Sequence, residues 1–235
     1  FMDTLVDYYK ETKDMETLKE FWPIAFKQIE LALEELDSNH IYKNNHGFFA
    51  FVDWAEGLER ETPFLAILIY VMKKAVSIAD LVNKNDHALL VEKIPQLETA
   101  SKQHLWDNNK KFFVSGPNQQ ISYASQVWMI LAGVVSKEEG KDLLNRLSYV
   151  EAIEPSTPYM YHHLIEAYIV VGEKKLATEK MKAYWGSMIE DGADTFWELY
   201  NPKDKTFSPY GGYLINSYCH AWSCTPTYLI RKHSL

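Results

Sequence analysis

Two kinds of helix alternate along the chain, and they differ in how their apolar residues are arranged. In the first kind, apolar side chains recur every three or four residues with Glu and Lys between them, as from Leu18 to Leu36. This spacing predicts an amphipathic helix with one buried face. Residues 87–105, 137–147 and 173–190 show the same pattern. Ser136 and Glu139 are spaced for a capping box, which predicts the start of the helix over 137–147.

The second kind of helix is apolar on nearly all sides, which predicts burial on all sides. Three of these helices open on residues that favour a helix start, namely Thr62-Pro63, Ser122 and Thr157-Pro158. A fourth is expected from about Tyr213 to Ile230. Amphipathic helices in alternation with fully apolar ones predict an outer ring of helices around an inner ring. The expected fold is therefore all-α, an (α/α)6 toroid of helical hairpins.

The chain shows no low-complexity segment and no linker, so residues 1–235 are expected to form one domain, the C-terminal part of a single (α/α) toroid catalytic domain. About nine helices are predicted, whereas six hairpins need twelve, and the pattern at Phe1 begins inside a helix. We therefore expect the ring to be incomplete at its N-terminus. Phe112-Phe113-Val114 predicts one short β segment.

The connections between the predicted helices have two lengths. Links from an outer to an inner helix are mostly long, over residues 38–62, 107–121 and 190–212, with a shorter one at 148–156. Links in the other direction are tight, as at Lys84-Asn85 and Gly172. In a toroid all the outer-to-inner links emerge on one rim, and long loops on a rigid scaffold are where functional sites occur. The sequence therefore predicts a site on that rim.

Composition and charge exclude some classes of function. The formal net charge of −8 is opposite to the basic surface that nucleic-acid binding needs. The longest apolar run, Phe64 to Met72, is well short of the ~20 residues of a membrane span. Aromatic residues make up 14% of the chain, which suits either a helical core or a site where aromatic rings stack on sugars. Cys219 and Cys224 are not expected to form a disulfide, and no signal sequence indicates a compartment.

Glu198 is the most conspicuous candidate for chemistry. It lies between Trp197 and Tyr200 in the loop over residues 190–212. A carboxylate partly desolvated among aromatic side chains has the environment of a general base or acid. The alternative is a Glu that caps a helix or pairs with a lysine.

The loop over residues 38–62 repeats the arrangement of a carboxylate beside a tryptophan. Asp53 could hydrogen-bond to sugar hydroxyls while Trp54 stacks on the ring, or Asp53 could instead form an Asx-turn into the next helix. The neighbouring charges Glu56, Glu59, Arg60 and Glu61 are expected to form a solvated turn.

Histidines supply the remaining candidates. His220 is expected near the start of the apolar helix over 213–230, where either a core or a site role is open, and Trp222 follows it. The adjacent side chains of His162 and His163 point about 100° apart on a helix, and no other residue has the spacing of a further metal ligand. No metal site is therefore predicted. No cofactor is expected.

Several motifs, taken in order, resemble those of a known family. Thr195-Phe-Trp-Glu198 is followed 22 positions later by His220-Ala-Trp-Ser223, with Pro226 just beyond, and Asp53-Trp54 precedes Thr62-Pro63. The segments Leu5 to Asp14 and Tyr184 to Met188 also fit. This order and spacing resembles the bacterial α-L-rhamnosidases of glycoside hydrolase family 78, in the clan of six-hairpin glycosidases. The resemblance covers nearly the whole chain.

The resemblance implies hydrolysis of terminal α-L-rhamnose with inversion and without a metal. It implies that Glu198 is the general base and that His220 touches the sugar. Asp53 and Trp54 would line the sugar pocket, and Trp197 and Trp222 would help to shape it. The expected partners are a rhamnose-containing glycan or glycoside and the rest of the parent chain, with no nucleic acid and no membrane span.

The chain departs from the family pattern in one respect. The family's general acid lies in an acidic motif that also contains Arg and Trp, upstream of the region that this chain matches, and no copy of it occurs here. These residues alone are therefore expected to show little or no hydrolysis. Two alternatives remain: another six-hairpin glycosidase, of the glucoamylase or trehalase type, or a non-catalytic carbohydrate-binding toroid. A toroid like those of terpenoid cyclases lacks support, since no Asp-rich metal motif is present.

Overall fold

The computed structural model describes residues 1–47 and 49–235. In this part of the chain there are nine α-helices, one π-helix, two short 3₁₀-helices and one two-stranded sheet. The α-helices are α1 (Met2–Thr12), α2 (Met15–Glu34), α3 (Glu61–Ala79), α4 (Lys84–Ala100), α5 (Tyr123–Leu131), α6 (Lys137–Leu147), α7 (Pro158–Val170), α8 (Lys174–Glu190) and α9 (Thr225–His233). The π-helix η1 is Ser101–Leu105, the strands are β1 (Trp106–Asp107) and β2 (Phe112–Phe113), and the 3₁₀-helices are η2 (Tyr213–Ile215) and η3 (Ala221–Ser223).

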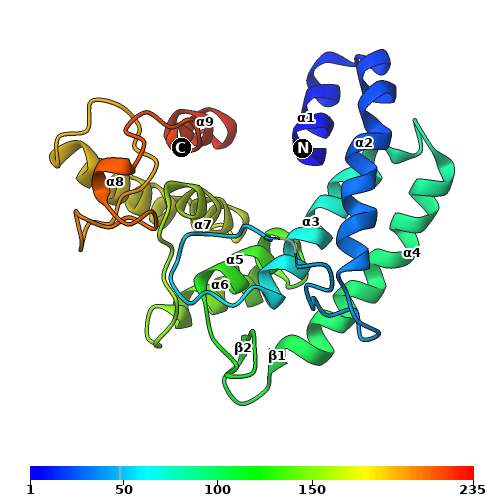
Figure 1. Cartoon of the computed structure of the whole chain (residues 1–235), viewed down its shortest axis with the longest axis horizontal. Helices are drawn as coiled ribbons and strands as arrows, with labels where there is room; N and C mark the ends of the chain where they lie inside the picture. Colours follow the sequence, from blue (N-terminus) through cyan, green and yellow to red (C-terminus); the bar gives the residue numbers. More distant parts are fainter. Residues whose placement is uncertain (48) are drawn as a thin grey trace.

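The helices form an arc of hairpins in two layers (Figure 1). The inner helices pack against one another in the order α1, α3, α5, α7 and α9. The outer helices α2, α6 and α8 each pack against the inner helix before them, and α4 packs against α3. Helices α3, α5 and α7 carry most of the core, because their side chains are buried on nearly every side. The predicted alternation of outer and inner helices is confirmed.

Local capping explains most of the helix starts. Ser136 and Glu139 form the predicted capping box at the start of α6, and Ser122 and Thr157 accept hydrogen bonds as N-caps of α5 and α7. Thr62 was expected to be an N-cap as well, and this prediction is wrong. The helix α3 already begins at Glu61, and the buried Thr62 hydroxyl donates to the carbonyl of Val114 instead.

The C-terminal segment differs most from the sequence prediction. A continuous buried helix from Tyr213 to Ile230 was expected, but the segment contains η2, η3 and the short helix α9. Residues 217–220 instead form backbone hydrogen bonds with residues 196–198. Of the residues in α9 only Leu229 is buried. The apolar side chains of this segment therefore do not indicate a core helix.

Helix α3 is long and apolar enough to cross a membrane by composition alone. In the structure it is a core helix, since 61% of its most apolar window is buried inside the fold. Packing against α1, α4 and α5 accounts for its apolar character.

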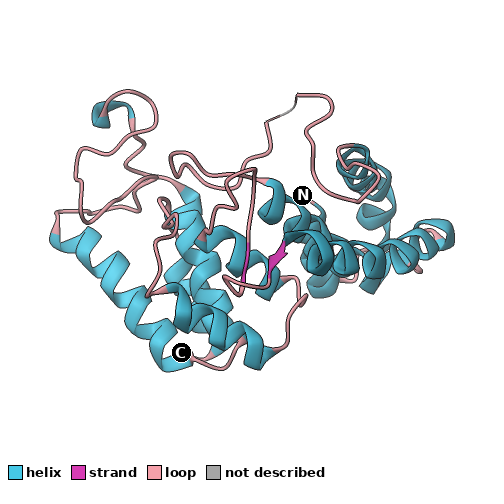
Figure 2. Ribbon diagram, turned by 90° about the horizontal axis from the view of Figure 1, so that it is seen from below, coloured by secondary structure: helices cyan, strands magenta, loops and turns pink. Residues whose placement is uncertain are grey.

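The long connections lie on one side of the helices, as predicted (Figure 2). The loop between α2 and α3 touches all the others. Its contacts are Asp53 with Thr157, Glu59 with Gln120, and Trp54 with Tyr210. The charged turn over residues 56–61 was expected to be solvated, but it is only partly so. Glu61 accepts a hydrogen bond from the backbone of Gly116, and the Arg60 guanidinium lies 4.7 Å from the centre of the Phe49 ring.

Candidate active site

The Glu198 carboxylate is held at the rim by two hydrogen bonds. Its Oε1 accepts from the Tyr210 hydroxyl at 2.6 Å, and its Oε2 accepts from the Ser217 backbone N–H at 3.0 Å. Glu198 is buried, with 9% of its surface exposed. An ionised carboxylate has about four lone-pair sites, so each oxygen of Glu198 keeps room for one more donor. A water molecule or a substrate hydroxyl could occupy that position.

The backbone around Glu198 is also fixed. Its N–H donates to the carbonyl of Ser217 at 2.8 Å, and its carbonyl accepts from the Trp222 indole at 2.8 Å. The His220 N–H donates to the carbonyl of Phe196 at 2.7 Å. The two motifs that lie 22 residues apart in the sequence are therefore joined by main-chain pairing. This pairing also explains why the segment containing His220 is not helical.

Tyr210 connects the carboxylate to the aromatic side chains of the rim. Burial, together with the hydrogen bond to Glu198, raises the pKa of Tyr210 to about 12. The hydroxyl therefore stays protonated at neutral pH and continues to donate to the carboxylate. The Tyr210 ring meets Trp54 edge to face, with the ring centres 5.6 Å apart.

Four aromatic side chains extend from Tyr210 into a cluster that includes two of the expected site residues. Trp54 meets the Phe51 ring at 5.3 Å, and Phe51 stacks on Trp222 at 5.8 Å. Tyr159 contacts both Phe51 and Trp222. The cluster draws on the loops over 35–60 and 191–224 and on the first turn of α7. Such a surface can pack against the apolar C–H face of a pyranose ring.

Asp53 is more deeply enclosed than Glu198, with 3% of its surface exposed. Its two carboxylate oxygens accept four hydrogen bonds, from the backbone N–H groups of Trp54 and Ser156 and from the hydroxyls of Ser156 and Thr157. Burial raises its pKa, and these hydrogen bonds oppose the rise. Oδ1 accepts three of these hydrogen bonds and Oδ2 accepts one, so the protein supplies four donors to Asp53 and two to Glu198. The geometry favours a role for Asp53 in holding the loop against the start of α7.

Of the remaining expected site residues, His220 contacts this cluster and Trp197 faces other aromatic side chains. The His220 ring meets Trp222, with ring centres 4.5 Å apart, and its Nδ1 accepts the Trp222 backbone N–H. Trp197 contacts Tyr200 and Tyr218 instead, beside a separate cavity of about 230 Å³. Trp197 therefore has no ring contact with the cluster around Trp54 among the described residues.

The sequence analysis did not single out Tyr210, Phe51 or Tyr159. All three are aromatic residues in or just after the long rim loops, which is the signal that could have found them. Tyr210 precedes Gly211-Gly212 and Tyr159 follows a proline, so each is in a segment that reads as a turn or a helix start. Their contacts join residues more than a hundred positions apart, and no local pattern predicts such contacts.

A second cluster of titratable groups lies on α7. The expectation that His162 and His163 lack a partner with ligand spacing is wrong, because Glu166 lies one turn further on and the three groups place ligand atoms within 4.8 Å of one another. The ammonium of Lys232 is 2.8 Å from Glu166 Oε1, which places a cation there already. Burial opposes ionisation of Glu166, but hydrogen bonds from His162 and Lys232 outweigh it and lower the pKa of that carboxyl. We interpret the cluster as the contact that holds α9 against α7.

An arc of helical hairpins that carries a buried carboxylate among aromatic side chains on its loop rim defines the domain of a six-hairpin glycosidase. The sequence profile of the family described as the bacterial alpha-L-rhamnosidase 6 hairpin glycosidase domain matches residues 4–233. The chain belongs to this family, as the order of its motifs indicated. A comparison with curated proteins gives no significant match.

Solved structures similar to the chain include two rhamnosidases. A rhamnosidase from Klebsiella oxytoca with rhamnose bound shares 38% sequence identity and a TM-score of 0.95, over 100% of this chain and 46% of its own. A family 78 rhamnosidase from Bacillus sp. GL1 shares 20% identity and a TM-score of 0.81, over 98% of this chain and 25% of its own. The second likeness supports the fold alone. The chain thus spans less than half the length of either structure.

Proposed function

We propose that the protein containing this chain is an inverting α-L-rhamnosidase and that Glu198 is its general base. The observation that carries the proposal is the state of the Glu198 carboxylate, which is buried, fixed by Tyr210 and Ser217, and still has free lone pairs. A base needs such a free lone pair to take a proton from water. Asp53, another buried carboxylate of the rim, accepts four hydrogen bonds from the protein, three of them at Oδ1.

The substrate follows from family membership and from the similar Klebsiella structure, which was determined with rhamnose bound. Trp54 and Trp222 belong to the aromatic cluster next to Tyr210, where they can pack against a sugar ring. His220, beside Trp222, can hydrogen-bond to a sugar hydroxyl through Nε2, since its Nδ1 accepts the Trp222 backbone N–H. Trp197 would help to shape the sugar pocket from the other side of the segment that contains Glu198.

The proposed reaction is a single displacement. Glu198 removes a proton from a water molecule, and that water attacks the anomeric carbon while a carboxylic acid protonates the leaving oxygen. Inverting enzymes separate the two carboxyl groups by roughly 6.5–9.5 Å so that the water fits between them. The proposal places the acid outside the residues of this chain, as the family resemblance implies.

The test is the Glu198→Gln variant of the whole protein, assayed with an aryl α-L-rhamnoside. Loss of the base is expected to lower kcat by about 10²–10⁴-fold with little change in KM, because proton transfer is lost but sugar contacts stay. Glu154→Gln is the matched control, since this exposed rim carboxylate only pairs with Lys203. Near-normal kcat in the Glu198 variant would assign Glu198 a structural role and refute the proposal.

A further inference from the structure

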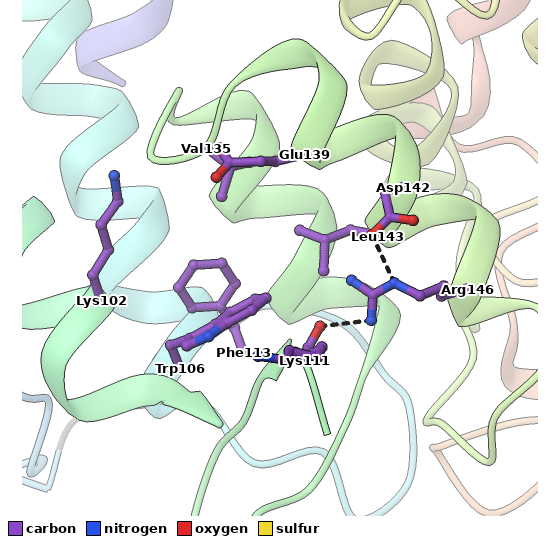
Figure 3. A pocket seen from close by; sticks show the side chains of 9 residues that line it. All are labelled: Lys102, Trp106, Lys111, Phe113, Val135, Glu139, Asp142, Leu143 and Arg146. Atoms are coloured by element: carbon purple, nitrogen blue, oxygen red, sulfur yellow. Dashed lines mark hydrogen bonds and ion pairs between the residues drawn. The ribbon is translucent and has the colours of Figure 1, made fainter. Parts of the chain in front are cut away.

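A pocket outside the proposed rhamnose site combines an aromatic floor with an excess of cationic side chains. It has a volume of about 420 Å³, within the roughly 300–1,000 Å³ range of small-molecule sites. It lies between the π-helix η1, the β1–β2 hairpin and the outer helix α6. Figure 3 shows the Trp106 indole on its floor, with Lys102 and Arg146 on opposite sides of the ring.

The floor of the pocket is rigidly supported. Trp106 pairs with Phe113 across the hairpin, and their rings meet edge to face at 5.0 Å. The fully buried side chain of Gln126, on the inner helix α5, holds both the N–H and the carbonyl of Phe113. The Trp106 indole is therefore attached to the core of the domain although it is itself only half-buried.

The backbone on one side of the pocket is unusual. Helix α4 continues directly into η1, a π-helix that carries Lys102 and ends immediately before Trp106. Short π-helical turns are rare and occur frequently at functional sites. In this chain the π-helix sets the direction in which Lys102 and Trp106 leave the helix.

The charges of the pocket leave a net demand for an anion. Its three cations are Lys102, Lys111 and Arg146, and its two carboxylates are Glu139 and Asp142. Asp142 accepts from Arg146 Nε at 2.7 Å. The hydrogen bond from the Ser136 backbone N–H and the nearby charge of Lys102 both lower the pKa of Glu139, so Lys102 is partly matched by that carboxylate. Among the residues that the structure describes, the Lys111 ammonium has no hydrogen-bond or ion-pair partner.

We propose that this pocket binds an acidic sugar residue, a hexuronate, as a second carbohydrate site of the domain. The C–H face of the pyranose packs on the Trp106 indole, and the sugar carboxylate takes the free Lys111 ammonium as a charge-assisted partner, while Lys102 adds to the positive charge of the pocket. A neutral sugar would leave the Lys111 ammonium unmatched. A bare inorganic anion would leave the indole uncovered.

The test measures binding by the whole purified protein with NMR of its tryptophan indole N–H signals. Sodium D-glucuronate is expected to shift the signal that the Trp106→Phe variant lacks, with an affinity about tenfold higher than that of methyl glucoside. Inorganic phosphate is expected to bind more weakly and without shifting that signal. Equal binding of glucuronate and the neutral glucoside, or an equal shift with phosphate, would overturn the proposal.

Substitutions in the pocket test which side chains bind the sugar. Trp106→Ala is expected to weaken glucuronate binding by about tenfold or more. The Lys102→Gln plus Lys111→Gln variant, which changes only exposed side chains, is expected to do the same and to remove the salt dependence. Lys137→Gln is the charge-matched control on α6, and it should bind normally.

The proposal does not depend on the role of Glu198. The Glu198→Gln variant of the whole protein should bind glucuronate as the unmodified protein does. Loss of binding in that variant would place the ligand at the rhamnose site and refute the second site, whatever its effect on hydrolysis.

Discussion

The two buried carboxylates of the rim differ in how many donors surround them. Glu198 accepts two hydrogen bonds and Asp53 accepts four. Three of the four reach Oδ1 of Asp53, so the protein engages this carboxylate more fully than Glu198. The difference supports the proposal that Glu198 takes a proton from water while Asp53 orders a loop, although both stand next to a tryptophan in the sequence.

The Asp53→Asn variant tests the ordering role. An amide keeps one acceptor and places an NH₂ group against the donors of Ser156 and Thr157, so buried donors lose their partners. The free energy of unfolding in urea is expected to fall by about 1–3 kcal/mol. Glu56→Gln in the same loop is exposed and should be neutral. Unchanged stability with a raised KM would show instead that Asp53 binds the sugar.

The Tyr210→Phe variant tests how far the carboxylate depends on its phenol partner. It removes the 2.6 Å hydrogen bond to Glu198 and keeps the ring that meets Trp54. Hydrogen bonds to charged groups contribute about 1.5–3 kcal/mol, so kcat is expected to fall by about 10- to 100-fold. Because the pKa of Tyr210 is about 12, its ionisation should not affect kcat of the unmodified protein below about pH 11. An unchanged kcat in the variant would mean that Ser217 alone suffices to place the carboxylate.

At the scale of secondary structure, the contact between α7 and α9 depends on buried ionisable groups. Burial, with repulsion from His162, lowers the pKa of His163 to about 3, whereas an unfolded chain has the ordinary value near 6.5. Glu166, paired with His162 and Lys232, also has a lowered pKa. In both cases the unfolded state binds protons more readily as the pH falls. Acid should therefore destabilise this pair of helices.

The His163→Phe variant measures that effect. Between about pH 6 and pH 4 the unfolded state takes up a proton that folded His163 excludes, so stability falls with decreasing pH by at most about 1.4 kcal/mol per unit. The variant should lose the fall in stability between about pH 6 and pH 4, and it should retain the fall below about pH 4.5 that comes from Glu166. Urea unfolding at several pH values provides the measurement. An identical slope in both proteins would show that His163 is protonated in the fold.

At the scale of the whole molecule, the hairpins place every long loop on one side, so residues from four loops meet there. The chain covers 46% of the Klebsiella rhamnosidase, and the stereochemistry of the reaction belongs to the whole protein. With Glu198 as a base acting on water, the first product from an aryl α-L-rhamnoside should be β-L-rhamnose. Proton NMR during the first turnovers distinguishes the anomers. Release of the α-anomer first would indicate a covalent intermediate and refute Glu198 as the base.

The sequence by itself determined most of the helices of this protein and their order, except in the segment over 213–230. Helix caps form between residues three positions apart, at Ser122, Ser136 and Thr157. The spacing of apolar residues in α2 and α3 indicates which helix faces are buried. These features depend on neighbours within one or two turns, which the sequence shows directly. It also indicated Glu198, because a carboxylate among aromatic residues in a long loop is visible without coordinates.

Only the tertiary structure decided which contacts the rim residues make. The segment over 213–224 has the composition of a buried helix, yet it pairs with residues 196–198, and that pairing requires the loop to fold back. Asp53 is held by hydroxyl and backbone groups of Ser156 and Thr157, which lie more than a hundred positions away. The number of donors that reach each carboxylate depends on segments that only the folded hairpins and their loops bring together.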